Sequence, residues 1–277
     1  FTHSLFFIPF GALIVAALIF PLVRKYLSFK TTYVASFFGY ATHGLLDACT
    51  SYGTVLFWPF SNERITWNNI SIVDPLLTIP ALILLAVAVK TNRRRFSFLA
   101  VGWIVSYLAF GLVQYERALS SGLKLAQSRG HSAERMTLKP SFGNLILWKS
   151  IYQHGDSFYV DAIRAGTTLS WCPGESIKIF DYQYHLPDLE ENSQQREDIE
   201  RFRWFSQDYL GFQNDKNLVT DVRYSMIPNQ IAPMWGLIID EQQGTNEHAA
   251  WWESRDLDDE SLTLFMEMLL GRKCTAT

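Results

Sequence analysis

The sequence predicts a mainly α-helical membrane domain with four transmembrane helices, followed by an α+β domain on the extracytoplasmic side. Long apolar runs lie almost entirely in residues 1–115, although the whole chain is only 48% hydrophobic. Charge divides in the same way, because residues 1–115 carry 8 basic and 3 acidic residues and the remainder carries 16 and 24. We therefore expect a transmembrane domain over residues 1–115 and a soluble periplasmic domain over residues 116–277.

The overall charge of the chain argues against a nucleic-acid partner. A net charge of −3 over 277 residues provides no strongly basic surface, which nucleic-acid binding usually requires. No nucleic-acid partner is evident, and membrane lipid is the partner that the apolar runs indicate. A wholly soluble protein is excluded.

Four apolar segments account for the expected transmembrane helices. Each has about 17–20 residues, and a helix needs about 20 to cross a hydrocarbon core of about 30 Å. They contain no Lys or Arg, and their only acidic residues are Asp47 and Asp74. The segments are Leu5–Val23, Tyr33–Cys49, Ile70–Val89 and Phe96–Val113.

Basic residues predict the orientation of these helices. They fill the first and third connecting loops and are Arg24, Lys25, Lys30, Lys90, Arg93, Arg94 and Arg95. The positive-inside rule places both loops in the cytoplasm. The loop Cys49–Asn69 and everything after Val113 then lie outside, which in a bacterial inner membrane is the periplasm. Because this multi-pass chain begins outside at Phe1 without an initiator Met, we expect at least one further membrane segment upstream.

Beyond the fourth segment, the pattern alternates between helical and strand-like periods. Residues Gln114–Gly130 are expected to continue the fourth helix outwards. Around His154-Gly155-Asp156, the runs Ile146–Gln153 and Ser157–Arg164 predict a hairpin. Further strand-like stretches are Ser176–Tyr184, Asp221–Met226 and Met234–Asp240, whereas Leu189–Leu210 and Asp259–Leu270 have helical spacing.

The three cysteines, Cys49, Cys172 and Cys274, do not have the spacing of a metal-binding motif. In an oxidising periplasm Cys172 and Cys274 are able to pair. Two isolated cysteines are equally consistent with free thiols, so the sequence leaves both alternatives open.

His43 and Asp47 form the first candidate site. They are four residues apart, so on a helix they share one face. An imidazole and a carboxylate presented together suit a divalent metal, most readily zinc. The alternative is a His–Asp hydrogen bond that stabilises the helices, since a charge inside an apolar segment is costly unless it is paired.

The expected topology adds further polar groups to this pair. His3 precedes the first membrane helix and Asp74 opens the third, so both lie at the outer interface with His43 and Asp47. The loop containing Ser51 and Thr54 lies there as well. Two histidines, two carboxylates and several hydroxyls are therefore expected at one interface, although this convergence played no part in assigning the topology.

Each of these residues also has a structural interpretation. Asp74 before Pro75 is typical of an N-cap followed by proline at the first helical position. Ser51 and Thr54 suit a turn. Arg64 is able to bind an anionic phosphate, but a lipid headgroup and Glu63 are equally good partners. Ser51, Thr54 and Arg64 are therefore only weak candidates for substrate binding.

A family resemblance is carried by five ordered motifs: Phe1-Thr2-His3-Ser4, Gly39-Tyr40-Ala-Thr-His43-Gly-Leu-Leu-Asp47, Thr50-Ser51-Tyr52-Gly53-Thr54, Trp58-Pro59-Phe60-Ser61 and Asp74-Pro75. Together they resemble the inner-membrane metal-dependent hydrolase family of the YdjM type. The resemblance covers about the first half of the chain. This family is distantly similar to zinc-dependent phospholipase C and P1-type nucleases, which implies phosphodiester hydrolysis by analogy.

The resemblance implies metal ligation by His43, Asp47 and His3. The chain departs from the family pattern, because it has neither the acidic and basic-glycine motifs upstream of Thr-His-Ser nor the later His-x-x-x-Glu pair of the soluble relatives. The set of ligands visible here is therefore expected to be incomplete.

The expected function is metal-dependent hydrolysis of a phosphoester or lipid-linked substrate at the outer face of the membrane. The metal would activate water, and Asp47 or Asp74 would orient that water or act as a base. The alternative is a non-enzymatic, membrane-anchored binding or envelope-maintenance protein whose polar cluster is structural. A transporter is less consistent with the sequence, because the four segments show no inverted repeat.

Overall fold

The computed structural model describes residues 1–255 and 258–276, which form two compact units. The first unit contains residues 1–112 together with 142–144, and the second contains the rest of the described chain. The helix that leaves the first unit continues into the second without a break.

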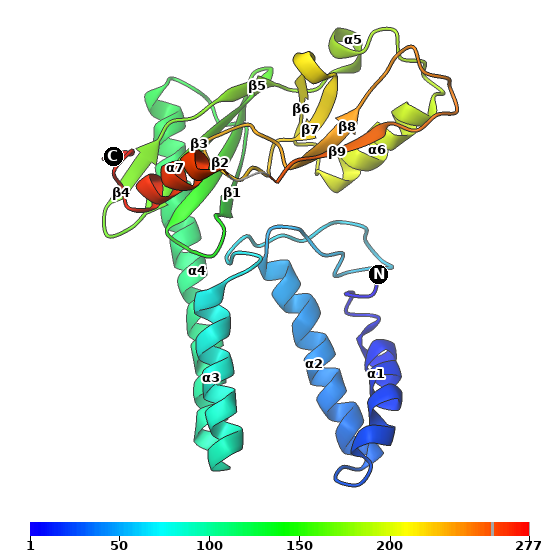
Figure 1. Cartoon of the computed structure of the whole chain (residues 1–277), viewed down its shortest axis with the longest axis vertical. Coiled ribbons are helices and arrows are strands. Elements are labelled where there is room, and N and C mark those ends of the chain that lie inside the picture. The colour runs from blue at the N-terminus through cyan, green and yellow to red at the C-terminus, as the bar shows by residue number, and fades with distance from the viewer. Residues whose placement is uncertain (256–257, 277) are drawn as a thin grey trace. The chain divides into compact units, whose positions relative to one another are not determined.

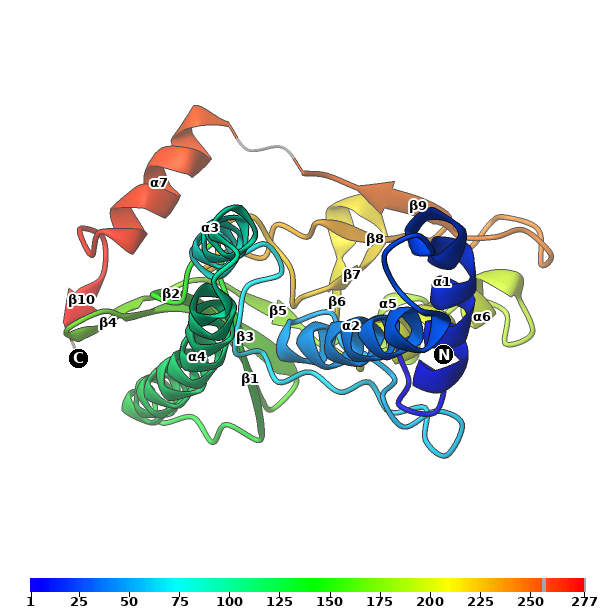
Figure 2. The same ribbon diagram turned by 90° about the horizontal axis from the view of Figure 1, so that it is seen from below.

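The first unit is built from helices α1 (Ile8–Val23), α2 (Phe29–Cys49), α3 (Pro75–Thr91) and the first part of α4 (Arg94–Ser128). In both views α1 lies alongside α2, and α3 lies alongside α4 (Figures 1 and 2). Ala12 and Ala16 are fully buried, because small side chains let neighbouring helices approach closely. The Trp103 indole donates to the carbonyls of Leu76 and Leu77, which joins α4 to α3.

Only one of the four helices is long and apolar enough by itself to cross a membrane. This helix is α4, which has 35 residues, and only 17% of its most apolar window is buried. Helices α1 and α3 are apolar but have 16 and 17 residues. At 1.5 Å per residue they span only about 24–26 Å of a core of about 30 Å.

The prediction of four transmembrane helices is therefore supported for α4 alone. The apolar run that begins at Leu5 starts as turns, and α-helix begins only at Ile8. The run that begins at Ile70 is irregular until Asp74 caps α3. Helix α2 is long enough, with 21 residues, but its hydroxyl, imidazole and carboxylate side chains make it the least apolar of the three.

The second unit contains two antiparallel sheets. The larger has the order β1-β2-β3-β4-β10, with β5 also paired to β3. Its strands are β1 (Arg135–Pro140), β2 (Leu147–His154), β3 (Ser157–Ala165), β4 (Leu169–Cys172), β5 (Ser176–Lys178) and β10 (Thr275–Ala276). The smaller has the order β6-β7-β8-β9, formed by Leu210–Gln213, Leu218–Asp221, Trp235–Ile238 and Ala250–Glu253. The described part of the unit also contains the short helix α5 (Tyr182–His185), the longer helices α6 (Gln194–Phe205) and α7 (Asp259–Leu269), and the 3₁₀ helix η1 (Asn214–Lys216).

The continuation of α4 packs on one face of the larger sheet. The Tyr115 ring meets Trp148 with centroids 6.0 Å apart, and the Trp171 indole donates to Ser121 Oγ at 2.8 Å. Just beyond the helix, the Arg129 guanidinium makes two hydrogen bonds to the buried Asp161 carboxylate. These contacts anchor α4 to the sheet, and they confirm that the fourth helix extends through Gln114–Gly130 as far as Ser128.

Several expected elements of the second unit are confirmed. Strands β2 and β3 form the predicted hairpin, in which Gly155 has a φ of +57° in a two-residue loop. That conformation favours glycine. Strand β8 lies within Met234–Asp240, and α7 occupies Asp259–Leu269 as predicted.

Other boundaries were wrong. The helix expected over Leu189–Leu210 is only α6, because Ser193 caps its start and Leu210 already belongs to β6. Ser176–Tyr184 divides into β5 and the beginning of α5. Asp221–Met226 is not a strand beyond Asp221, because the Asp221 carboxylate accepts the backbone N–H of Arg223 and turns the chain.

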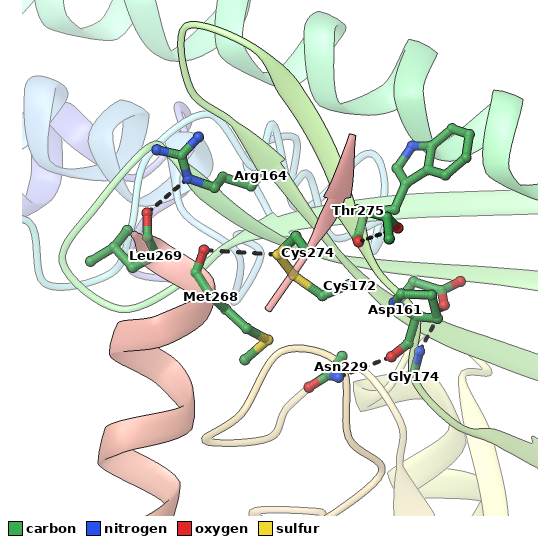
Figure 3. Close-up of a disulfide and its surroundings, with 11 residues drawn as sticks. Asp161, Arg164, Cys172, Gly174, Asn229, Met268, Leu269, Cys274 and Thr275 are labelled. Carbon is green, nitrogen blue, oxygen red and sulfur yellow. Dashed lines mark hydrogen bonds between the residues drawn. A yellow bond between two sulfur atoms is a disulfide. The ribbon is translucent and has the colours of Figure 1, made fainter. Parts of the chain in front are cut away.

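Cys172, the last residue of β4, forms a disulfide with Cys274, which directly precedes β10 (Figure 3). The structure thus selects pairing from the two alternatives that the sequence left open. The Arg164 guanidinium donates to the Leu269 carbonyl beside it, so the end of α7 is held to the same sheet. Cys49 is a buried free thiol.

Candidate metal centre

Three side chains from two parts of the first unit bring one ligand atom each to a common point. His3 Nε2 lies 3.0 Å from His43 Nε2 and 3.3 Å from Asp47 Oδ2. His43 Nε2 lies 3.8 Å from the same carboxylate oxygen. Among the described residues, this is the group of histidine, cysteine and acidic side chains with the geometry to hold a metal ion. We refer to His3, His43 and Asp47 as the ligand triplet.

These distances fit a tetrahedral zinc ion. Zinc binds histidine nitrogen and carboxylate oxygen at about 2.0–2.2 Å, so neighbouring ligand atoms of a tetrahedron lie about 3.3–3.6 Å apart. The three separations of 3.0, 3.3 and 3.8 Å are centred close to this range. Nitrogen and oxygen donors are also those that zinc accepts. The residues present therefore fit the metal that the sequence predicts.

The triplet is open to its surroundings. The side chains of His3, His43 and Asp47 are 42%, 62% and 41% exposed. A structural zinc site is closed by four protein ligands, whereas a catalytic site keeps a coordination position for water or substrate. Three accessible protein ligands match the second arrangement.

Helix α2 fixes two of the ligands through its own geometry. His43 and Asp47 are four residues apart near the end of the helix and therefore lie on one face. Ser28 caps the other end, where its hydroxyl accepts the N–H of Thr31. The relative position of these two ligands is thus set by helical periodicity.

His3 comes from the segment before α1, and tertiary contacts hold it in place. The Tyr40 hydroxyl donates to the Thr2 carbonyl at 2.8 Å. Thr2 Oγ1 lies 3.2 Å from His3 Nδ1, so a proton on Nδ1 leaves Nε2 free as a ligand. Such second partners orient metal-binding histidines and select their tautomer.

Gly44 allows this segment to approach α2. A Cβ placed on Gly44 would lie 2.6 Å from the backbone oxygen of His3, closer than real atoms come. The Gly39-Tyr40 and Gly44 positions belong to the sequence motif that carries the family resemblance, but only the structure shows what Thr2, Tyr40 and Gly44 contribute. Their sequence separation from His3, about 40 residues for Tyr40 and Gly44, conceals these contacts.

Asp74 is not among the convergent ligands. Its side chain is buried, and Oδ1 accepts the backbone N–H groups of Leu76 and Leu77 at 3.1 Å. The Tyr107 hydroxyl lies 2.9 Å from both carboxylate oxygens. The structure therefore shows Asp74 as the N-cap of α3, as its sequence context predicts, and nothing shows contact with the ligand triplet.

The three weak candidates for substrate binding, Ser51, Thr54 and Arg64, lie in the loop after α2. Arg64 Nη2 donates to the carbonyls of Tyr52 and Gly53. Thr54 pairs through its backbone with Ile65, and both Ser51 and Thr54 are buried. These positions show structural contacts, and their predicted role in substrate binding stays a prediction.

Comparison with known proteins finds a family similarity for the helical region. Residues 1–118 match the model of the YdjM inner membrane protein family. No curated protein and no solved structure matches the chain, and the distant similarity to phospholipase C and P1-type nucleases stays a prediction. The family description indicates an inner-membrane location. Residues 1–118, which contain the whole ligand triplet, are thus the part of the chain that is similar to the YdjM inner membrane protein family.

Proposed function

We propose that the chain is a membrane-bound, metal-dependent hydrolase that acts on a phosphoester or lipid-linked substrate at the outer face of the inner membrane. The observation that carries this proposal is the convergence of three ligand atoms from His3, His43 and Asp47. The open geometry of the triplet favours catalysis over a purely structural ion. A buried His–Asp pair that only stabilised the helices would need neither His3 nor this degree of exposure.

In this proposal His3, His43 and Asp47 hold a divalent ion, most readily zinc. The ion would supply a bound water of lowered pKa and would polarise a phosphoryl oxygen. The convergent atom of Asp47 is Oδ2, so we assign its Oδ1 to orient the attacking water. Thr2 and Tyr40 position His3, and Asp74 holds the start of α3.

We further propose that all four helices cross the membrane, with the basic loops in the cytoplasm. The outward side chains of α1 and α3 support this, because Leu18, Leu22 and Val89 are 71%, 80% and 84% exposed. Such large apolar surfaces are unfavourable in water and suit lipid. The turns before α1 and α3 would lengthen these short helices at the interface, where the bilayer also adapts to a short span.

A periplasmic location of the second unit has separate support. Disulfides persist in oxidising compartments and are rare in the cytosol, and Cys172 is bonded to Cys274. The charge of the loops and the chemistry of the cysteines are independent observations, and both favour the same orientation.

Metal binding and hydrolysis are tested with the full-length protein purified in detergent. The wild type should retain a stoichiometric divalent ion and hydrolyse bis(p-nitrophenyl) phosphate. His43→Ala and Asp47→Asn should lower metal affinity by more than roughly 100-fold, because even loss of a residue that only orients a metal ligand costs about 10–100-fold. The matched control is His248→Ala, which removes a histidine whose Nδ1 lies 2.8 Å from Asp198 Oδ2 in the second unit.

Metal and hydrolysis that survive both substitutions would contradict the assignment of the ligands. A folded full-length protein that binds no divalent ion would instead favour the non-enzymatic alternative, a membrane-anchored binding or envelope-maintenance protein. The His248→Ala control separates loss of a ligand from a general effect of removing a His–Asp pair.

A further inference from the structure

An apolar groove runs between α1 and α2 and ends at the ligand triplet. It has a volume of about 500 Å³, and one of its lining residues is His43. From α1 it is lined by Val15, Ile19 and Val23, which are four residues apart and therefore form one stripe along the helix. Figure 1 shows these two helices side by side, joined by the short connection after α1.

The facing wall of the groove is made of small side chains. Ala35, Ser36 and Gly39 line it from α2, and a Cβ built on Gly39 meets nothing within 4 Å. The open space beside Gly39 is therefore part of the groove, in contrast to the tight contact at Gly44. Apart from the hydroxyls of Thr32, Ser36 and Tyr40 and the imidazole of His43, the lining offers only carbon surface from side chains.

The groove is long as well as apolar. Its lining on α2 extends from Thr32 to His43, and eleven residues of helix rise about 16 Å. It therefore runs from near the start of α2 to the ligand triplet, along about half of the helix. A groove of this length, apolar along its course and bounded by metal ligands at one end, fits a linear hydrocarbon chain attached to a polar head.

We propose that this groove holds an acyl chain of a membrane phospholipid, with the phosphoester of the same molecule at the ligand triplet. This assignment rests on the proposed hydrolytic function. It narrows the substrate class to phospholipids whose acyl chain occupies the groove. Binding of the chain positions the head group because His43 belongs to both the groove and the triplet. The chain is already out of water in the bilayer, so van der Waals packing against the groove, and not removal of apolar surface from water, would favour its binding.

Photolabelling tests the groove independently of catalysis. The probe is phosphatidylglycerol with a diazirine near the methyl end of one acyl chain, in vesicles that also contain phosphatidylethanolamine and the full-length protein. We expect labelling near Val23 and Thr32 to exceed labelling on the outward face of α3. Gly39→Phe and Ala35→Phe should each suppress the labelling near Val23 and Thr32, because they block the groove about one and two helical turns from His43.

Gly102→Phe is the matched control, because Gly102 lies in the apolar part of α4 and also has nothing within 4 Å of an added Cβ. Uniform labelling of all outward faces would indicate contact with bulk lipid only and would contradict acyl-chain binding in the groove. Labelling that neither blocking variant reduces would contradict it as well. Suppression by either variant but not by Gly102→Phe supports the groove even if the protein binds no metal. Conversely, a metal-loaded and active wild type with unaffected labelling would retain the hydrolase and reject the acyl-chain site.

Discussion

The backbone oxygen of His3 lies 2.6 Å from the position that a Cβ of Gly44 would occupy. Gly44→Ala should therefore push the segment carrying His3 away from α2, while His43 and Asp47 keep their positions on the helix. We expect this variant to lose metal affinity by at least roughly 10-fold, as expected when the orientation of a ligand is disturbed. Metal titration of the purified protein measures the effect.

Gly102→Ala is the control for that experiment. It introduces the same methyl group into a helix, at a position where nothing lies within 4 Å, so its metal affinity should equal that of the wild type. Equal affinity of Gly44→Ala and the wild type would show that His3 is not held in the triplet by this contact.

The proposed membrane topology predicts the location of four reporter fusions. Fusions after Lys30 and Arg95 should report a cytoplasmic location, because seven cations lie in these two connections or in the helix turns beside them. Fusions after Ser61 and Gly130 should report the periplasm. If the fusion after Gly130 is cytoplasmic, the ligand triplet moves to the inner face and the proposed orientation is wrong.

The cysteines predict a definite number of reactive thiols. The sequence contains three cysteines, and only Cys49 is free in the structure. Denatured protein should therefore react with one maleimide per chain before reduction and with three after reduction. Cys49→Ser should remove the reaction before reduction, whereas three reactive thiols without reductant would show that Cys172 and Cys274 do not pair.

Lys149 predicts a pH dependence of the second unit. Its side chain is buried, and its ammonium group donates to Ser225 Oγ and the Gln230 carbonyl. Burial lowers the pKa of Lys149 to about 7, although Glu175 and Asp221 act in the opposite direction. The unfolded lysine has a pKa of about 10.4, so between these values the unfolded chain binds more protons than the folded one.

The free energy of unfolding contributed by this group should therefore rise with pH between about 7 and 10, by at most about 1.4 kcal/mol per pH unit. Below pH 7 the cost of burying the charged lysine is present in full. Denaturant titrations should show that slope in the wild type and not in Lys149→Met. Lys178→Met, which removes an exposed lysine of the same sheet, should keep the slope, and parallel curves for all three proteins would contradict the assignment.

Local sequence signals predicted those parts of the fold that depend on short-range geometry. The β2–β3 hairpin follows from alternating runs around Gly155, and the N-cap of α3 follows from Asp74 before Pro75. Strand β1 gives a weak signal because it carries Lys139 at a buried position and ends in Pro140. Strands β6, β7 and β9 have only four residues each, too few for a period to be recognised.

Side-chain chemistry overrode the pattern after β7. The alternating stretch that starts at Asp221 reads as a strand, yet Asp221 and Arg223 form a fully buried ion pair two residues apart. The Asp221 carboxylate also accepts the backbone N–H of Arg223, and this local turn takes the chain out of the sheet after Asp221. The sequence shows that Asp221 and Arg223 are close in the chain, but it does not show that both side chains are buried.

The ligand triplet was partly predictable for a similar reason. The spacing of His43 and Asp47 requires only a helix, whereas His3 required the expected topology, since it lies 40 residues before His43. The hydrogen bond from Tyr40 to Thr2 has no local signal at all. The proposed metal ligands could therefore be predicted from the sequence. The residues that hold His3 in place could be identified only from the structure.

The disulfide closes a covalent ring around much of the second unit. Its two cysteines are 102 residues apart in the sequence, and the ring contains the whole of the smaller sheet together with α6 and α7. A single cut of the backbone anywhere inside this ring would leave both pieces joined to the same molecule. If the second unit lies in the periplasm, as proposed above, a proteolytic nick in the ring would not release its C-terminal portion, and the fragments would separate only when the disulfide is also reduced.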